Sequence, residues 1–157
     1  MPGWFDLFDW PIGVGCKRDG PGLERSVQTV ESCVTALIQK GIERDRIVIG
    51  GFSQGGAIAM QAAYSEMTTG DSYAGCVSLS GWVNFDEVHE SVKDTPLFWG
   101  HGQYDDKVLF EQQDFGARTL VELGVSSVES QSYPMAHSSH PEEMKAFASF
   151  LDKVLYK

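Results

Sequence analysis

Apolar residues recur along the chain with two different periods, which predict β-strands alternating with α-helices. Short, largely apolar runs predict strands at 47–49, 73–79 and 95–101, and a fourth strand is predicted at 127–133. Apolar residues at helical spacing predict helices at 22–41, 57–63, 110–123 and 141–155. Strands and helices that alternate in this way favour a parallel sheet with right-handed crossovers, so the predicted fold class is α/β, with about four strands flanked by helices.

Two sequence signals mark helix ends. Gly41 follows the first helical stripe and is expected to end that helix in the left-handed conformation. Before the last helix, Ser139 and Glu142 have the spacing of a capping box, and Pro141 suits the first turn.

The first 21 residues show no helical period, although they contain many large apolar side chains. These are Trp4, Phe5, Leu7, Phe8, Trp10 and Ile12. Two interpretations are open. The segment is either a loop pinned to the core by its aromatic residues or one wall of an apolar substrate groove.

Composition is that of one globular domain spanning residues 1–157, because 42% of the residues are hydrophobic and 22% are charged. No apolar run is long enough to span a bilayer, and the N-terminus lacks the pattern of a signal peptide. We therefore expect a cytoplasmic protein with no integral membrane association. The net charge of −10 would repel phosphate groups, which argues against nucleic acid as a partner.

The three cysteines suggest neither a disulfide framework nor a zinc site, because their number is odd and no C-x-x-C spacing occurs. Cys33 and Cys76 are expected to be small core residues on a helix and a strand. Cys16 lies in a predicted loop and is the one candidate for a reactive thiol. No motif implies a metal or an organic cofactor.

The segment Gly51-Phe52-Ser53-Gln54-Gly55 fits the pattern G-x-S-x-G between a predicted strand and a predicted helix. In a nucleophile elbow of this pattern, the serine sits in a strained turn at the carboxyl end of a strand. A side chain two residues before or after the serine is expected to collide across the turn, and glycine enters left-handed conformations without penalty. The alternative is an ordinary glycine-rich turn between a buried strand and a buried helix.

The loops after the third and fourth predicted strands offer partners for Ser53. In an open parallel sheet, these loops leave the same edge as the elbow. We assign Asp105 in the first loop as the acid and His137 in the second as the base, in the chain order Ser, Asp, His. The histidine would accept the serine proton, and the carboxylate would orient the ring and stabilise the imidazolium.

Other residues compete for these roles, and each has a structural interpretation. Asp106 is the main rival of Asp105 and is otherwise a surface carboxylate. His140 is expected to cap the last helix, and His101 to bond within its own loop. His89 has no supporting pattern around it.

These motifs resemble those of the acyl-protein thioesterase, lysophospholipase and carboxylesterase family of α/β hydrolases. The similarity rests on segments 4–6, 50–56, 101–105 and 135–139, in the family's order and at about its spacing. It runs along essentially the whole chain. Residue by residue, it implies Ser53 as nucleophile, Asp105 as acid and His137 as base.

The chain departs from the family pattern at its start. Family members begin with further strands and a His-Gly-Leu-Gly-like loop that supplies half of the oxyanion hole, whereas residues 1–6 resemble an internal segment. The backbone N–H of Gln54 can supply one oxyanion donor, and no residue is assigned as the second. We expect an N-terminally shortened sheet whose elbow strand lies at an edge, where pairing into a homo-oligomer is possible.

The leading hypothesis is hydrolysis of an ester or thioester through an acyl-enzyme on Ser53. The resemblance implies an acylated protein, a lysophospholipid or a small ester as substrate. The stretch 81–94 is too short for a lid domain, so Trp82 and the N-terminal aromatic residues are expected to line an open groove. The alternatives are a weakly active or non-catalytic module that binds acyl groups or a protein, and a natural protein that is longer at its N-terminus.

Overall fold

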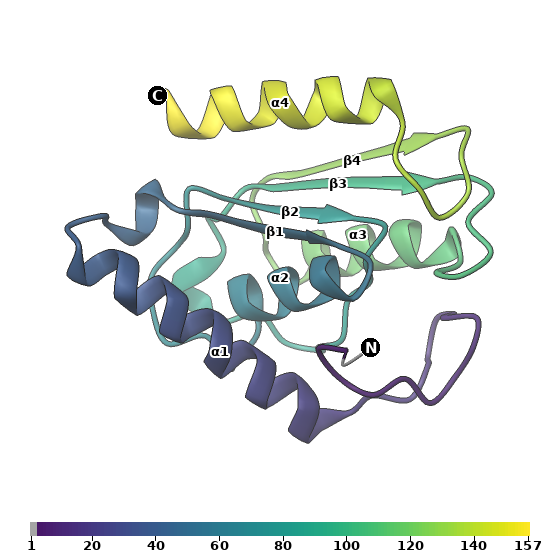
Figure 1. The fold of residues 1–157 in the computed structure, drawn as a ribbon, viewed down its shortest axis with the longest axis horizontal. Helices are drawn as coiled ribbons and strands as arrows, with labels where there is room; N and C mark the ends of the chain where they lie inside the picture. Colours follow the sequence, from purple (N-terminus) through teal and green to yellow (C-terminus); the bar gives the residue numbers. More distant parts are fainter. Residues whose placement is uncertain (1–2) are drawn as a thin grey trace.

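The computed structural model describes residues 3–157, and Met1 and Pro2 lie outside the described residues. It confirms a parallel sheet of four strands, in the order β1-β2-β3-β4 (Figure 1). The strands are β1 (Val48–Phe52), β2 (Gly75–Leu79), β3 (Leu97–Gly102) and β4 (Val128–Tyr133). The α-helices are α1 (Gly20–Gln39), α2 (Gln54–Tyr64), α3 (Glu111–Glu122) and α4 (Pro141–Leu155). Two short 3₁₀ turns, η1 (Arg44–Arg46) and η2 (Glu90–Val92), lie in the connections.

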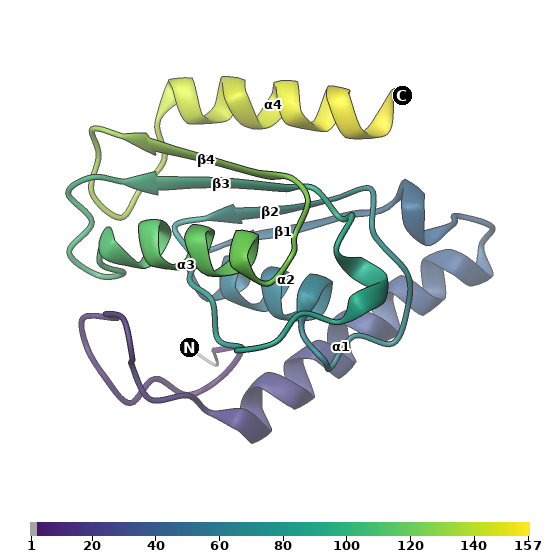
Figure 2. The ribbon, with the colours of Figure 1, turned by 180° about the vertical axis from the view of Figure 1, so that it is seen from behind.

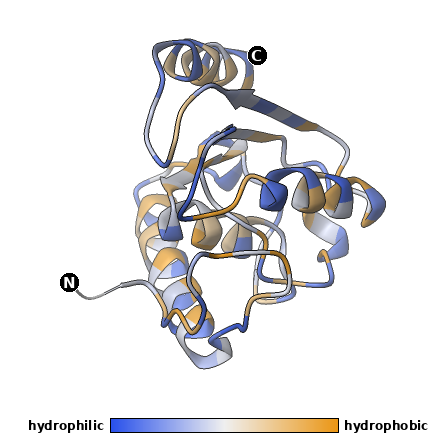
Figure 3. Cartoon of the chain, turned by 90° about the vertical axis from the view of Figure 1, so that its right-hand side faces the viewer, coloured by the Kyte–Doolittle hydropathy of each residue, from blue (hydrophilic) through white to orange (hydrophobic). Residues whose placement is uncertain are grey.

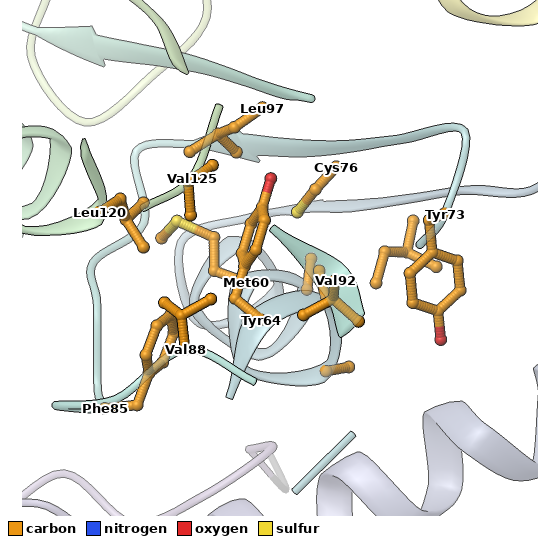
Figure 4. Packing of buried hydrophobic residues seen from close by; sticks show 14 of the residues in the cluster. Met60, Tyr64, Tyr73, Cys76, Phe85, Val88, Val92, Leu97, Leu120 and Val125 are labelled. Atoms are coloured by element: carbon orange, nitrogen blue, oxygen red, sulfur yellow. The ribbon is translucent and has the colours of Figure 1, made fainter. Parts of the chain in front are cut away.

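Helices cover both faces of the sheet, which explains why β2 and the first part of β3 are apolar runs with little alternation, whereas the outer strand β4 is largely polar. Figures 1 and 2 show α4 on one face and α1, α2 and α3 on the other. On the side of α2, Met60, Tyr64, Cys76 and Leu97 are completely buried in the largest hydrophobic cluster (Figure 4). A smaller cluster beneath α4 is made by Val77, Phe98, Phe150 and Val154.

The helix ends agree only in part with the sequence signals. Gly41 follows the end of α1 with a φ of 90°, as predicted. Pro141 begins α4, also as predicted, but the residue that caps this helix is His140, whose ring accepts a hydrogen bond from the backbone of Glu142. The predicted capping box is therefore wrong, because α4 begins one residue later than a box starting at Ser139 requires.

The cysteine predictions meet different outcomes. Cys76 is completely buried in β2, as expected, and Cys16 is partly exposed in the N-terminal loop. Cys33 is exposed, so its assignment to the core is wrong. The buried stripe of α1 passes through Val27 and Val34, and consecutive helical residues point about 100° apart, which turns Cys33 away from that stripe.

The N-terminal loop, residues 3–19, lies beside the carboxyl ends of the strands (Figures 1 and 2). Phe5 and Ile12 are buried in the protein, and Ile12 forms a parallel bridge with Val108. Figure 3 faces this edge of the sheet, with α4 above it. Two aromatic residues stay open to solvent, Phe8 and Trp10, which are 50% and 63% exposed. The loop is thus pinned at two points, as the first interpretation predicted, while part of its apolar surface remains accessible.

Strand β1 is an outer strand of the sheet, as expected for the strand that carries the elbow. Across residues 3–157, it pairs with β2 alone. None of the helices in this range has the length and apolar character needed to cross a membrane.

Candidate active site

Ser53 occupies a strained turn between β1 and α2. Its φ of 56° and ψ of −120° place a serine in a region that side-chain-bearing residues rarely adopt. The turn is fixed from both sides, because the Ser53 N–H donates to the carbonyl of Leu79 at 2.8 Å and its carbonyl accepts from the N–H of Ala57 at 3.0 Å. This geometry agrees with the nucleophile elbow predicted from the sequence.

The two glycines that flank Ser53, Gly51 and Gly55, differ in whether a side chain would collide across the turn. A Cβ on Gly51 would lie 2.4 Å from the carbonyl carbon of Gly55, so a side chain there does collide. A Cβ on Gly55 would meet no atom within 4 Å outside its own helix backbone and chain neighbours, so the expected collision at Gly55 is wrong. The left-handed φ belongs to Ser53 itself. Gly55 already lies in the first turn of α2, where its missing side chain would point away from the elbow.

Ser53, His137 and Asp105 form a connected chain of hydrogen bonds. His137 Nε2 lies 3.0 Å from Ser53 Oγ, and His137 Nδ1 lies 2.8 Å from Asp105 Oδ2. A carboxylate can only accept, so Nδ1 donates to Asp105 and Nε2 is left to accept the serine hydroxyl proton. The ring of Phe52 packs against His137 with centroids 4.8 Å apart.

In the turn after β3, Asp105 rather than Asp106 faces His137. Asp105 is 5% exposed, and its Oδ1 accepts from the backbone N–H groups of Lys107 and Val108, each at 2.9 Å. These bonds leave Oδ2 directed at His137. The side chain of Asp106 is 76% exposed and lies 3.8 Å from Lys107 Nζ. The arrangement therefore agrees with the predicted surface role of Asp106.

The remaining histidines lie outside the hydrogen bonds to Ser53. His140 caps α4, as predicted, and His89 caps η2 by accepting from the N–H of Ser91. His101, at the end of β3, is completely buried and bonds the carbonyl of Val108, which is the loop contact expected for it. Burial lowers the pKa of His101, partly opposed by the bond to Val108 and the charge of Asp105.

Gln54 has two distinct connections. As the first residue of α2, it carries one of the backbone N–H groups that lack an acceptor within the helix, next to Ser53 and at the positive end of the helix dipole. Its side-chain amide accepts from the N–H of Trp4 at 3.3 Å and donates to the carbonyl of Phe5 at 2.8 Å. No sequence pattern predicts this second role, because a glutamine amide can both donate and accept and the N-terminal loop has no periodicity.

Trp82 is a core residue in this structure. Its side chain is 1% exposed, its Nε1 donates to Asn84 Oδ1 at 3.0 Å, and its ring packs edge-on against Phe5. The expectation that Trp82 lines an open groove therefore needs correction. The apolar surface accessible on the N-terminal loop comes from residues such as Phe8 and Trp10.

Similarity to known proteins agrees with this geometry. A sequence model of the phospholipase/carboxylesterase family matches residues 1–155. Acyl-protein thioesterase 1 of Aspergillus fumigatus is 35% identical over 169 residues, which span 99% of this chain and 68% of that protein. Its counterpart in Saccharomyces cerevisiae is 34% identical over 166 residues, with 99% and 70% covered.

Solved structures show the same fold. The crystal structure of Arabidopsis thaliana SOBER1 superimposes with a TM-score of 0.90 at 32% identity, covering 99% of this chain and 75% of that one. Acyl-protein thioesterase 2 of Zea mays gives a TM-score of 0.81 at 26% identity, covering 98% and 72%.

Proposed function

The chain belongs to the phospholipase/carboxylesterase family of ester and thioester hydrolases, and on that premise we propose that it acts through an acyl-enzyme on Ser53. The observation that carries this proposal is the pair of hydrogen bonds that His137 forms, to Ser53 Oγ at 3.0 Å and to Asp105 Oδ2 at 2.8 Å. Nucleophile, base and orienting acid are then within reach of one another before any substrate binds.

In the first half of the reaction, Ser53 Oγ attacks the acyl carbon while His137 Nε2 takes its proton. Asp105 stabilises the imidazolium that forms. The tetrahedral intermediate places a negative charge on the former carbonyl oxygen, and the N–H of Gln54 is the donor that we assign to it. Collapse of the intermediate expels a thiol or alcohol, which receives the proton from His137 and leaves the acyl group on Ser53.

In the second half of the reaction, water hydrolyses the acyl-enzyme. His137 again acts as general base, now toward a water molecule, and returns the proton to Ser53 as the acid product leaves. We assign no residue as the second oxyanion donor. One such donor contributes on the order of 100- to 1000-fold in turnover in other hydrolases, so Gln54 alone would support a slower reaction than a complete pair.

The relatives' names guide the choice of substrate. Several relatives carry the name acyl-protein thioesterase 1, so we propose acylated protein thiols as the first substrate class to test, with lysophospholipids and small esters as alternatives. The exposed Phe8 and Trp10 support an apolar acyl chain, because they belong to the N-terminal loop, and this loop lies beside the carboxyl ends of the strands (Figure 1).

A purely binding role is not favoured, and labelling tests it directly. A fluorophosphonate probe should label the purified chain at Ser53, as located by mass spectrometry, and Ser53→Ala should abolish both labelling and hydrolysis of p-nitrophenyl esters while keeping the fold. Turnover that persists in Ser53→Ala would contradict the assignment, and failure of the folded wild type to react would restore the binding hypothesis.

The open edge of β1 supports association of two copies, which we propose as a secondary feature. Sedimentation of the purified chain would test it. A strictly monomeric protein at all concentrations would contradict this part of the proposal without affecting the assignment of Ser53.

A further inference from the structure

A second histidine lies against the acid of the proposed triad. His101 Nε2 is 3.4 Å from Asp105 Oδ2, the same oxygen that accepts from His137, and 2.9 Å from the carbonyl oxygen of Val108. The side chains of His101 and Asp105 are both completely buried. Asp105 Oδ2 thus lies between two imidazole rings, of which one faces Ser53 and the other faces the protein interior.

The partners of His101 fix its protonation state. On one side, Trp99 Nε1 donates to His101 Nδ1 at 3.4 Å. An indole N–H can only donate, so Nδ1 must be the acceptor, and the proton of a neutral ring must lie on Nε2. The carbonyl of Val108, which can only accept, agrees with a proton on Nε2. Both neighbours therefore specify the same neutral tautomer.

A charged His101 would be disfavoured by the same contacts. Protonation would place an N–H on Nδ1 facing the N–H of Trp99, with donor against donor. The titratable groups facing this ring are Asp105, which favours the cation, and His137, which opposes it, while Trp99 and Phe110 complete its aromatic surroundings without titrating. Burial is the largest influence on His101, and it lowers the pKa of the ring.

This neutrality matters for the charge of Asp105. If both rings were imidazolium ions, the single charge of Asp105 would have to stabilise both of them. Because His101 is neutral, the full negative charge of Asp105 can stabilise the imidazolium of His137. The N–H of His101 donates to the carbonyl of Val108 and lies 3.4 Å from Asp105 Oδ2, while the N–H groups of Lys107 and Val108 hold Oδ1. The oxygen facing His137 therefore has a neutral ring behind it, which leaves its negative charge in place.

We propose that His101, held in its neutral tautomer by Trp99, is a positioning residue that aims Asp105 at His137 and reserves its negative charge for that ring. This inference rests on the proposed function, in which His137 is the base. The contacts then run from Trp99 through His101, Asp105 and His137 to Ser53, with a 3.4 Å separation between His101 Nε2 and Asp105 Oδ2 as the step that is not a hydrogen bond.

The competing explanation is a merely structural role. His101 also hydrogen-bonds the carbonyl of Val108, and Val108 forms a parallel bridge with Ile12. Two substitutions separate the explanations. His101→Gln retains an amide N–H near the position of Nε2, whereas His101→Leu removes every polar atom at similar bulk. The pKa of His137 reports the charge that Asp105 presents to it, and the Tm of each variant reports the anchoring of the loop separately.

The experiment measures this pKa by NMR titration in the Ser53→Ala background, with and without each His101 substitution. With Ser53 present, the pH dependence of kcat and KM is measured for the same variants. In His101→Leu we expect the pKa of His137 to fall and kcat to drop about 10- to 100-fold with little change in KM, the size of loss that follows a misplacement of about 1 Å. His101→Gln should recover most of both quantities.

Trp99→Phe provides a second test if His101→Leu does not fold. Without the indole donor, His101 can accept a proton. When the pH is lowered, the activity of Trp99→Phe should therefore be lost at a higher pH than the activity of the wild type. An unchanged pKa of His137 in both His101 variants, or equal losses of kcat in the Leu and Gln variants, would overturn the inference. Labelling of the wild type at Ser53 in parallel separates this failure from failure of the proposed function, because the NMR titration does not require catalysis.

Discussion

Replacing Gly51 by alanine tests whether the elbow leaves room for a side chain two residues before Ser53. The added Cβ would lie 2.4, 2.6 and 2.7 Å from the carbonyl carbon, carbonyl oxygen and Cα of Gly55, all of them backbone atoms. Contacts between real Cβ atoms and their neighbours are rarely shorter than about 3.4 Å, so β1 and the start of α2 would have to separate by about 1 Å.

The size of the effect follows from that displacement. Overpacking of this kind costs about 1–3 kcal/mol of unfolding free energy, which corresponds to a fall of roughly 2–12 °C in Tm for a domain of this size. Because Ser53 lies in the displaced segment, we also expect kcat to fall by on the order of 100-fold, the typical result of a 1 Å error in catalytic geometry.

Gly55→Ala is the matched control for stability. Its Cβ would meet no atom within 4 Å outside its own helix backbone and chain neighbours, and alanine is the better helix former by about 1 kcal/mol. Thermal unfolding should therefore show a lower Tm for Gly51→Ala and an equal or higher Tm for Gly55→Ala. Fluorophosphonate labelling rates would report the displacement of Ser53. A Gly51→Ala protein with wild-type Tm and labelling rate would refute the steric argument.

Three further outcomes follow from buried or paired carboxylates. In Asp105→Asn, the new amide would face His137 with a donor and favour the wrong tautomer, so kcat should fall by on the order of 10⁴-fold, as in other hydrolases of this type; a loss below tenfold would contradict the role assigned to Asp105. Burial raises the pKa of the Glu143 carboxyl, partly opposed by a hydrogen bond from the backbone of His140, so the stability of the folded protein decreases as pH rises above about 4.5. Glu143→Gln should therefore unfold at a higher temperature than the wild type at neutral pH. The gain in unfolding free energy should be on the order of 1 kcal/mol and should vanish in acid. For Glu31, burial would raise the pKa, but the hydrogen bonds and charge of Arg44 outweigh it and hold the pKa below its usual value. The stabilisation from this pair is present above about pH 4.5 and lost as pH falls through the folded-state pKa, so chemical denaturation of Glu31→Gln should show a weaker acid dependence than the wild type.

The grouping of Ser53, Asp105 and His137 at one edge of the sheet could be predicted because each residue lies in a loop or turn that follows a predicted strand. Ser53 lies in a glycine-rich turn, and Asp105 and His137 lie in polar loops after the third and fourth strands. In a parallel sheet the carboxyl ends of strands share one edge, so topology brings together residues that are distant in sequence. Periodicity also located all four strands and the four long helices, because strands buried on both faces and amphipathic helices carry strong patterns.

The sequence was less informative where orientation within an element decides the outcome. Cys33 lies one residue from the buried Val34, and a one-residue error moves a helical side chain from core to solvent. Trp82 follows a strand end, like the triad residues, yet its ring turns inward onto Phe5. The neutral tautomer of His101 depends on Trp99 two residues earlier on the same strand, and no pattern distinguishes this pair from two ordinary core residues.

The side chain of Gln54 gives the nucleophile a link to a distant part of the chain. One amide at the start of α2 holds both the N–H of Trp4 and the carbonyl of Phe5, while the backbone of the same residue borders the reacting group. A shift of the N-terminal loop would therefore pull on the residue next to Ser53. The two hydrogen bonds of this amide therefore couple the position of the N-terminal loop to that of the turn that holds Ser53.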